Sequence, residues 1–448
     1  MTFGLDRTRL QFPVLYLTRF ATGFGFATLA VLLATYVNQY DPSGLMLGLF
    51  TSGFAIAQTI AVVPIAYLGD ARDKRNVLVG VLALGVLAYV GFAALDVYSG
   101  GEWAFVGVRA VQGAAVTGSG LLSLALVGDR SPPTETAQFI GKANSWRLLA
   151  GILGGGVSGI LYDVYGFGVV YSVIVGLLSV AMAGVVFVLS PDTTRVEGFP
   201  FRDLAVNARI LTLTGFRAPY AVAVTLVRTW VLLYAGVEAL QGGLGFAVAA
   251  VSIVYGAERF TNMICQPYTG RLSDRFGRAM FVAAGGGAYG LVALAVPFAP
   301  DLASAIALPS ASALATAVAG LPGVDALVDA STAAGLVERG LDTPSGTFLV
   351  LVALNGLLGV ADSFREPASM ALFADEGSDG DGVASSFGIR ELVWRPGSVL
   401  APLAGGVLTE QVGYASVFYV GGASALVGVG AFLAALWYTQ GADALTSW

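Results

Sequence analysis

Ionisable side chains inside long apolar segments are the residues of this sequence with the clearest chemical potential. Asp362 and Glu366 are four residues apart and share one helix face, and Arg365 lies three residues from Asp362. Glu258 and Arg259 are adjacent in a second apolar segment. A deep charge is costly in a bilayer and usually faces a cavity, so the three carboxyl groups are predicted to bind a coupling ion, a proton or sodium. The alternative is a buried network that only braces the helices.

Deep arginines indicate a second chemistry, the recognition of an anion. A guanidinium group binds a carboxylate or phosphate at two points. The first half of the chain contributes such arginines without a deep carboxylate, while Arg147 lies near the inner end of a segment, where a structural or gating role is expected. Aromatic residues extend the predicted wall, although spans also use them for packing alone. The predicted substrate-binding residues are Arg19, Arg109, Arg228, Arg259, Trp230 and Tyr234.

The composition places these residues in a membrane. Of the 448 residues, 56% are hydrophobic and 12% are charged, against roughly 25% charged residues in soluble domains. The mean hydropathy is +0.77. With one cysteine, Cys265, and no histidine, an intrachain disulfide, a multi-cysteine metal site and histidine-based catalysis are excluded. We expect no catalytic residues, no cofactor and no metal, and no nucleic-acid partner.

Twelve apolar segments are long enough to span a bilayer, which needs about 20 residues. They predict an all-α, polytopic protein with two pseudo-symmetric six-helix bundles. The predicted spans are 12–37, 45–69, 77–98, 103–127, 143–164, 167–190, 218–240, 246–270, 279–299, 346–374, 385–410 and 414–438.

Loop charge and the position of the apolar segments predict the topology. Lysine and arginine gather in loops on one side, which places both termini in the cytoplasm of a cell (plasma) membrane protein. The first apolar run is too long for a cleavable signal peptide. The predicted organisation is an N-terminal bundle (1–190), a cytoplasmic linker (191–217), a C-terminal bundle (218–438) with an external insertion (300–345), and a cytoplasmic tail (439–448).

A charged loop is repeated just under half a chain length apart. The sequence around Asp70 and Arg72 is answered by the sequence around Asp274, and each copy lies between two apolar runs. A carboxylate at a helix end can bond an arginine or the start of a neighbouring helix, and such a bond can hold a gate shut. The alternative is a tight turn anchored by positive charge. The predicted gate or latch residues are Asp70, Arg72, Asp274, Arg275, Arg278, Arg390 and Arg395.

These motifs resemble the major facilitator superfamily over nearly the whole chain. The segment from Gly270 to Arg278 fits the family loop pattern G-x-L-x-D-R-x-G-R, and the first copy is degraded, with Asp73 in a glycine position. Arg109 with Gly113 resembles a family pattern associated with proton coupling. A glycine-rich fifth span resembles that of family exporters but lacks their Gly-Pro step. The resemblance implies alternating access between two six-helix bundles, with the repeated loop as a conformational latch.

The expected function is secondary active transport of a small organic solute, with binding near the bilayer midplane. Proton-coupled efflux or exchange of an anionic or amphipathic compound is the first choice, and proton- or sodium-coupled uptake of a metabolite such as a sugar or organic acid is the alternative. A membrane enzyme is a remote alternative, since no enzyme motif is present. A transporter-fold sensor is equally remote, since no soluble stretch exceeds the predicted 300–345 insertion. The expected partners are the substrate, the coupled ion and the lipid bilayer, and the expected state is a monomer.

Overall fold

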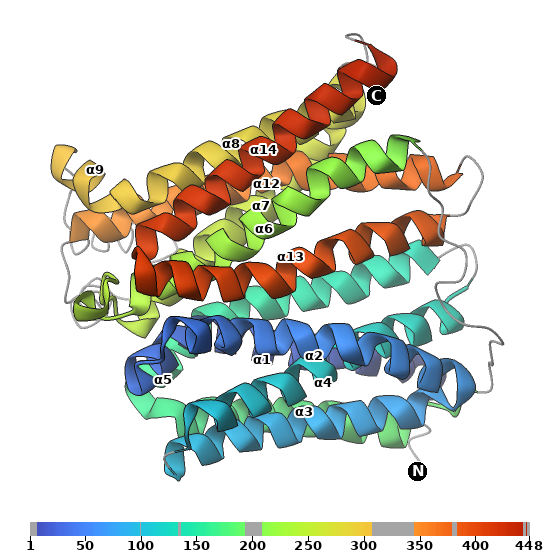
Figure 1. The fold of residues 1–448 in the computed structure, drawn as a ribbon. Helices are drawn as coiled ribbons and strands as arrows, with labels where there is room; N and C mark the ends of the chain where they lie inside the picture. Colours follow the sequence, from blue (N-terminus) through green and yellow to red (C-terminus); the bar gives the residue numbers. More distant parts are fainter. Residues whose placement is uncertain are drawn as a thin grey trace, which may run out of the picture. The chain divides into compact units, whose positions relative to one another are not determined.

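The computed structural model describes residues 7–98, 100–132, 136–192, 208–306, 345–378 and 383–441, together with residue 445. These residues form helices joined by short connections (Figure 1), in agreement with the predicted all-α polytopic fold. The earlier helices are α1 (Arg7–Tyr40), α2 (Gly44–Ala71), α3 (Lys74–Val97), α4 (Glu102–Arg130) and α5 (Thr136–Val188). The later helices are α6 (Ala208–Gly236), α7 (Val248–Phe276), α8 (Arg278–Ala295), α9 (Ala299–Ala305), α12 (Ser345–Ser378), α13 (Val383–Gln411) and α14 (Tyr414–Gln440), with the short 3-10 helices η1 (Ala239–Gln241) and η2 (Val296–Phe298).

Nine helices in the described part of the chain are long and apolar enough to cross a membrane. The helix α5 contains two predicted spans, because Gly166 (φ 71°, ψ −173°) interrupts its helical backbone between them. The helices α7 and α13 contain two further predicted spans but are not among the nine. Both carry charged and polar residues, which lower their hydropathy, and α7 holds two of the deep charges discussed below.

Three predicted segments lie largely outside the described residues. Of the predicted linker, residues 193–207 are not described, and α6 already begins at Ala208. Of the predicted insertion, residues 307–344 are not described, and the short helix α9 ends at Ala305. Of the predicted tail, α14 continues to Gln440, and only residues 441 and 445 are described beyond it. The predicted roles of these segments stay predictions.

The helices form two compact units. The first consists of Met1–Ala30 and Met46–Arg202, and the second of Val31–Leu45 and Asp203–Trp448. The division therefore falls inside α1, whose last residues pack in the same unit as α6 to α14. In the first unit α3 packs against α4 and α5, and in the second α12 packs against α7 and α8 while α6 packs against α13 and α14.

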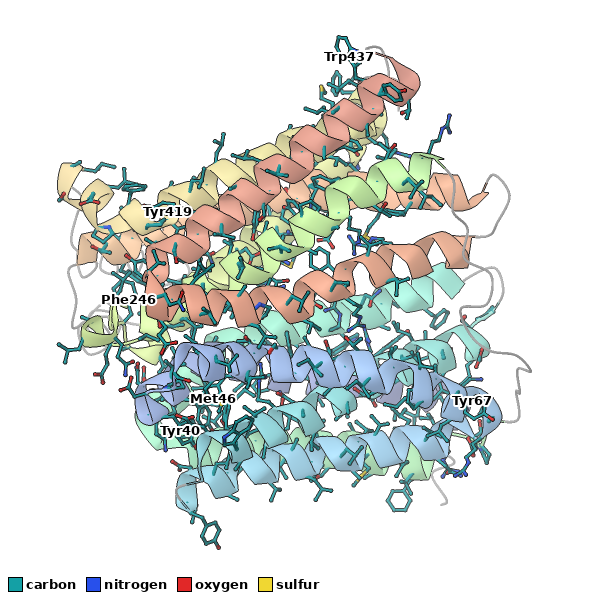
Figure 2. The ribbon with its side chains drawn as sticks, viewed as in Figure 1. Tyr40, Met46, Tyr67, Phe246, Tyr419 and Trp437 are labelled. Carbon is teal, nitrogen blue, oxygen red and sulfur yellow. The ribbon has the colours of Figure 1, made fainter. Side chains whose placement is uncertain are left out.

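Large aromatic side chains are exposed near helix ends, as expected where a helix leaves the apolar part of a bilayer. Tyr67 near the end of α2 and Trp437 near the end of α14 both point away from their helices (Figure 2). Their exposed fractions are 58% and 71%, and Trp103, at the start of α4, is also 71% exposed. These residues fit the aromatic belt of a membrane protein.

Candidate functional site

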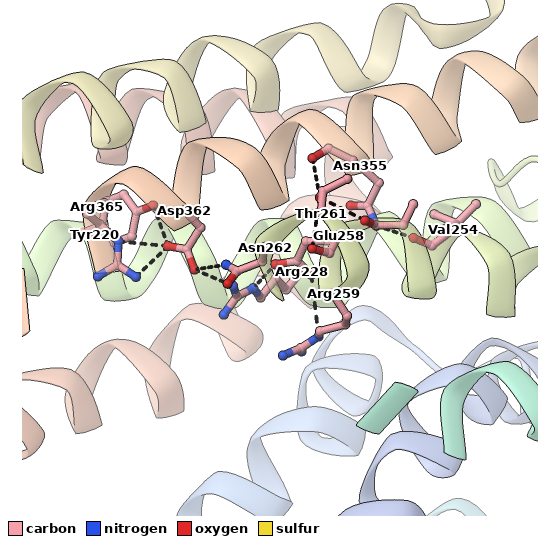
Figure 3. Close-up of polar contacts among 12 residues, drawn as sticks. Tyr220, Arg228, Val254, Glu258, Arg259, Thr261, Asn262, Asn355, Asp362 and Arg365 are labelled. Atoms are coloured by element: carbon pink, nitrogen blue, oxygen red, sulfur yellow. Dashed lines mark hydrogen bonds and ion pairs between the residues drawn. The ribbon is translucent and has the colours of Figure 1, made fainter. Parts of the chain in front are cut away.

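A buried ionic network centred on Asp362 occupies the second unit (Figure 3). The carboxylate of Asp362, on α12, has no exposed surface. Its Oδ1 accepts hydrogen bonds from Arg365 Nε at 2.8 Å and Nη2 at 2.5 Å, and from the Tyr220 hydroxyl at 3.3 Å. Its Oδ2 accepts from Arg228 Nη2 at 2.8 Å and from Asn262 Nδ2 at 3.2 Å. Four side chains from three helices therefore saturate this carboxylate.

The carboxylate of Glu258, on α7, is held differently. Its Oε1 lies 2.5 Å from Arg228 Nε, and its Oε2 lies 3.8 Å from Arg259 Nε. The second distance is an ion pair without a hydrogen bond, and Arg259 Nε has no hydrogen-bond partner among the described residues. The guanidinium of Arg259 instead lies over the ring of Tyr255, 5.2 Å from its centroid. One close donor thus holds Glu258, although its side chain is only 6% exposed.

Direct packing of α7 on α12 positions both carboxylates. The Thr261 hydroxyl donates to the Gly356 carbonyl at 2.7 Å, and Asn355 Nδ2 donates to the Val254 carbonyl at 2.5 Å. A side chain at Gly359 would overlap the Glu258 carbonyl, so only glycine allows this approach of the two backbones. Polar side chains bonded to facing carbonyls and a glycine contact are the usual means of joining membrane helices.

Glu366 does not join this network by a direct bond. Its side chain is half-buried on α12 and makes neither a hydrogen bond nor an ion pair with the rest of the described chain. Asp362, four residues earlier, is instead turned to Arg228 and Arg365. The two carboxyl groups that the sequence places on one helix face are therefore not bonded to each other.

Arg109 and Arg19 lie in the first unit, and each has only neutral hydrogen-bond partners among the described residues. Arg109 Nε donates to the Phe50 carbonyl at 3.0 Å and its Nη1 donates to Gln112 Oε1 at 2.7 Å. Gln112 in turn donates to the Tyr89 hydroxyl at 2.7 Å. Arg19 Nη2 donates to Asn144 Oδ1 at 2.9 Å and its Nη1 donates to the Gly120 carbonyl at 3.2 Å. Both side chains are buried, with 6% of their surface exposed.

The two aromatic residues predicted for the substrate wall have packing positions in the structure. Trp230 is fully buried, and its indole Nε1 donates to the Thr409 hydroxyl on α13 at 2.7 Å. Tyr234 is 9% exposed, and its ring lies 5.7 Å from that of Phe418 and 6.2 Å from that of Tyr414. Their predicted contact with substrate stays a prediction.

The second copy of the repeated loop forms a local ion pair. Arg278, at the start of α8, donates from Nε and Nη2 to Asp274 Oδ1, at 2.8 Å in each case. Gly277, between the helices, has a φ of 104°, which explains glycine at this position of the motif. The guanidinium of Arg275 lies 5.3 Å from the ring centroid of Phe276.

The first copy of the loop differs from the second. The side chain of Asp70 lies outside the described residues, and Arg72 is exposed. Asp73 caps α3 by accepting a hydrogen bond from the Arg75 amide at 2.9 Å. Lys74 is buried between Asp129, at 3.0 Å, and Asp192, at 3.1 Å.

The predicted latch partners on α13 have other neighbours in the second unit. Arg217 Nε donates to the Arg390 carbonyl at 2.6 Å, and the Arg217 guanidinium lies over the ring of Trp394 at 4.7 Å. Arg390 is buried and Arg395 is half-buried. Whether either residue acts on Asp70 stays a prediction.

Sequence reasoning from charge alone missed the neutral members of these clusters. Tyr220, Asn262 and Asn144 each contact a deep charge but carry none themselves. An amide side chain within an apolar span is itself a signal, since it requires a hydrogen-bond partner there. Asp192 was missed because it lies just after a span, in the predicted linker.

The long apolar helices define a polytopic helical membrane protein, and ionic clusters buried in such helices are candidate functional sites. The family model of the Major Facilitator Superfamily matches residues 15–341. The chain belongs to this superfamily, and it is a secondary transporter, not an enzyme. It is accordingly a multi-pass membrane protein with a small-molecule substrate.

One relative and two solved structures illustrate the likeness. An uncharacterized MFS-type transporter of Methanocaldococcus jannaschii is 24% identical over 283 residues, which cover 60% of this chain and 70% of the relative. A point mutant of the nucleoside transporter NupG superposes with a TM-score of 0.69 at 14% identity, covering 96% of this chain and 99% of its own. A bacterial homolog of the human lysosomal transporter Spinster, in an inward-facing and unoccupied conformation, gives a TM-score of 0.60 at 14% identity and covers 96% of both chains. At these identities the two structures show the fold alone.

Proposed function

We propose that this transporter couples a proton to the movement of a small organic anion. The observation that supports the anion is an excess of arginines over carboxylates among the buried and half-buried residues of the spans. Arg19 and Arg109 donate hydrogen bonds only to neutral groups, while Arg228, Arg259 and Arg365 share Asp362 and Glu258. Uncompensated buried charge is unfavourable, so this balance of charge favours an anionic partner.

The proposed proton-binding group is Glu258. Protonation of Asp362 would weaken hydrogen bonds to four side chains, whereas protonation of Glu258 would weaken one close hydrogen bond. The charged and titratable groups around Glu258 are Arg228 on α6, Asp362 on α12, Tyr289 on α8 and Arg259 on its own helix. Asp362 is then an anchor that fixes Arg228 and Arg365. Glu366 retains its predicted coupling role only as an alternative.

The geometry supports movement of proton and anion in the same direction. When Glu258 takes a proton, Arg228 and Arg259 lose a negative partner and attract an external anion more strongly. Proton binding and anion binding therefore assist each other, as in co-transport. This favours the uptake alternative over the efflux or exchange that the sequence suggested first, and a sodium ion has no comparable vacant carboxylate cluster in the described residues.

Substrate-dependent proton flux in proteoliposomes tests this proposal. A pH dye is trapped inside, and small organic anions, sugars and lipophilic cations are added in separate experiments. We expect an inward proton flux with anions only. Glu258→Gln is expected to abolish the flux and retain anion counterflow, while the matched control Glu366→Gln retains both. Flux with cations or sugars alone would contradict an anionic substrate. A normal flux in Glu258→Gln would contradict the role of Glu258 as the coupling residue.

A further inference from the structure

Arg19 carries a buried positive charge whose hydrogen bonding is incomplete. Its side chain is more than nine-tenths buried, and its Nε has no hydrogen-bond partner among the described residues. The two bonds it makes, to Asn144 Oδ1 and the Gly120 carbonyl, go to neutral oxygens. A buried guanidinium without an anion is unfavourable, because it has lost its hydration without gaining a counter-charge. The residue is therefore incomplete as a purely structural element.

A second arginine lies beside it on α5. Arg147 is three residues after Asn144, so the two share a helix face. Its Cγ lies 3.4 Å from the position that a Cβ on Gly23 would take, and Gly23 is one turn from Arg19 on α1. Arg147 is exposed, and its charge is close enough to repel that of Arg19. An anion bound beside both side chains would reduce the repulsion between them.

The seam between α1 and α5 is a rigid support for these groups. The Thr28 hydroxyl donates to the Gly154 carbonyl at 3.2 Å. A Cβ on Gly154 would lie 2.5 Å from the Phe24 carbonyl, and one on Gly23 would lie 3.1 Å from the Ala150 Cβ. Backbones in such close contact fix the relative positions of the side chains that project from them.

An aromatic pair borders the arginines on the same seam. The rings of Phe20 and Trp146 meet edge to face, with centroids 6.0 Å apart and an interplanar angle of 80°. Each is the sequence neighbour of one of the two arginines, and Trp146 is 43% exposed. An apolar surface beside two guanidinium groups matches an organic anion with an apolar or aromatic body.

We propose that Arg19, Asn144 and Arg147 bind the carboxylate or phosphate group of the transported anion, while Phe20 and Trp146 contact its apolar body. This inference rests on the proposed function and gives the anion a binding site within the first unit. Arg109 is not part of this seam: its Nε and Nη1 donate to Phe50 and Gln112, and its guanidinium lies 4.9 Å from the ring centroid of Phe54.

Equilibrium binding to the purified full chain, without a proton gradient, tests the site. The probes are benzoate, phenyl phosphate and inorganic phosphate, with benzamide as the neutral counterpart of benzoate, and calorimetry is the readout. We expect Arg19→Gln and Arg147→Gln to weaken benzoate or phenyl phosphate binding by about 10- to 100-fold, as for a lost charge-assisted bond. Lys142→Gln, which removes an exposed charge on the same helix, leaves affinity unchanged. Trp146→Ala removes the preference for phenyl phosphate over inorganic phosphate.

With soluble probes, any of these results would overturn the proposal: no saturable binding of any anion to the wild type, benzamide binding as tightly as benzoate, or unchanged affinity in both arginine variants. Arg19→Lys, which keeps the charge, serves as a second variant if Arg19→Gln does not fold.

A phospholipid also carries a phosphate, so retained lipid is measured by mass spectrometry. Anionic lipid that is lost only in the arginine variants, with no soluble anion bound, assigns the site to lipid and overturns a substrate role. Intact anion binding without proton flux would contradict the proposed coupling and leave this site standing.

Discussion

Lys74 and Asp192 form a buried ion pair, with 3.1 Å between Nζ and Oδ2 and only 6% and 7% of their side chains exposed. Lys74 begins α3, whereas Asp192 lies just beyond the end of α5. Asp129, near the end of α4, completes the contact at 3.0 Å. The Asp73 carboxylate also accepts a hydrogen bond from the Asp192 amide at 3.0 Å. One end of the first unit is thus closed by a cluster that joins three helices.

Replacing Lys74 by methionine is expected to destabilise the protein strongly. Removing one partner of a buried ion pair leaves an uncompensated charge, which costs about 3–5 kcal/mol. The thermal unfolding midpoint of the detergent-solubilised protein, followed by circular dichroism, measures the effect. Lys142→Met, which removes an exposed lysine, is the matched control. Equal midpoints for Lys74→Met and the control would mean that the cluster contributes nothing to stability.

The two central carboxylates of the second unit are expected to differ in the same assay. Asp362→Asn removes the negative charge between Arg228 and Arg365, of which Arg365 is only 4% exposed, and should cost about 3–5 kcal/mol. Glu258→Gln removes one close contact of Arg228, which keeps Asp362 and is 27% exposed, so the loss should be clearly smaller. A larger loss for Glu258→Gln would reverse the assignment of anchor and proton-binding group.

The sequence predicted the helices and the deep charges, but not the pairing of these charges. Long apolar runs define spans because backbone polar groups must be satisfied within the helix, so the helical fold follows from local composition. The pairing depends on which helices touch. Nothing near Asp362 in the sequence indicates that it pairs with Arg228. The other donors, Asn262 and Tyr220, are neutral, so a search for charged residues does not find them. The Asp274–Arg278 pair is different, because both residues belong to one short motif and are therefore close in the sequence.

Thr409→Val tests whether Trp230 packs or binds substrate. The variant removes the hydroxyl that accepts the Trp230 indole N–H at 2.7 Å and leaves a buried donor unsatisfied. We expect a loss of about 1–3 kcal/mol in stability, with the KM for transport unchanged. Transport kinetics and thermal unfolding of the same preparation provide both values. A raised KM with normal stability would instead support the substrate contact predicted from the sequence.

Asn38 connects the last turn of α1 to the end of α6. Its Nδ2 donates to the Gly236 carbonyl at 2.9 Å, and its Oδ1 accepts from the Glu238 amide at 3.0 Å. Gln241 Nε2 similarly donates to Asp41 Oδ1 at 2.7 Å. These bonds tie the two helix ends together within the second unit. We therefore expect this contact to hold the last turn of α1 against the second unit.

Asn38→Leu should favour release of this contact, because it removes both hydrogen bonds and leaves the Glu238 amide and the Gly236 carbonyl without this partner. The readout is maleimide labelling of a single cysteine, Val37→Cys, in a Cys265→Ser background, since Val37 is only 3% exposed. We expect labelling in the Asn38→Leu variant to be several-fold faster than with Asn38 present. Leu240→Cys, at a position that is 97% exposed, should label equally fast in both backgrounds and controls for reagent access. If Val37→Cys labels at the same slow rate with and without Asn38, these hydrogen bonds do not hold the end of α1 in place, because the reagent reports exposure of Val37→Cys directly and independently of substrate or proton.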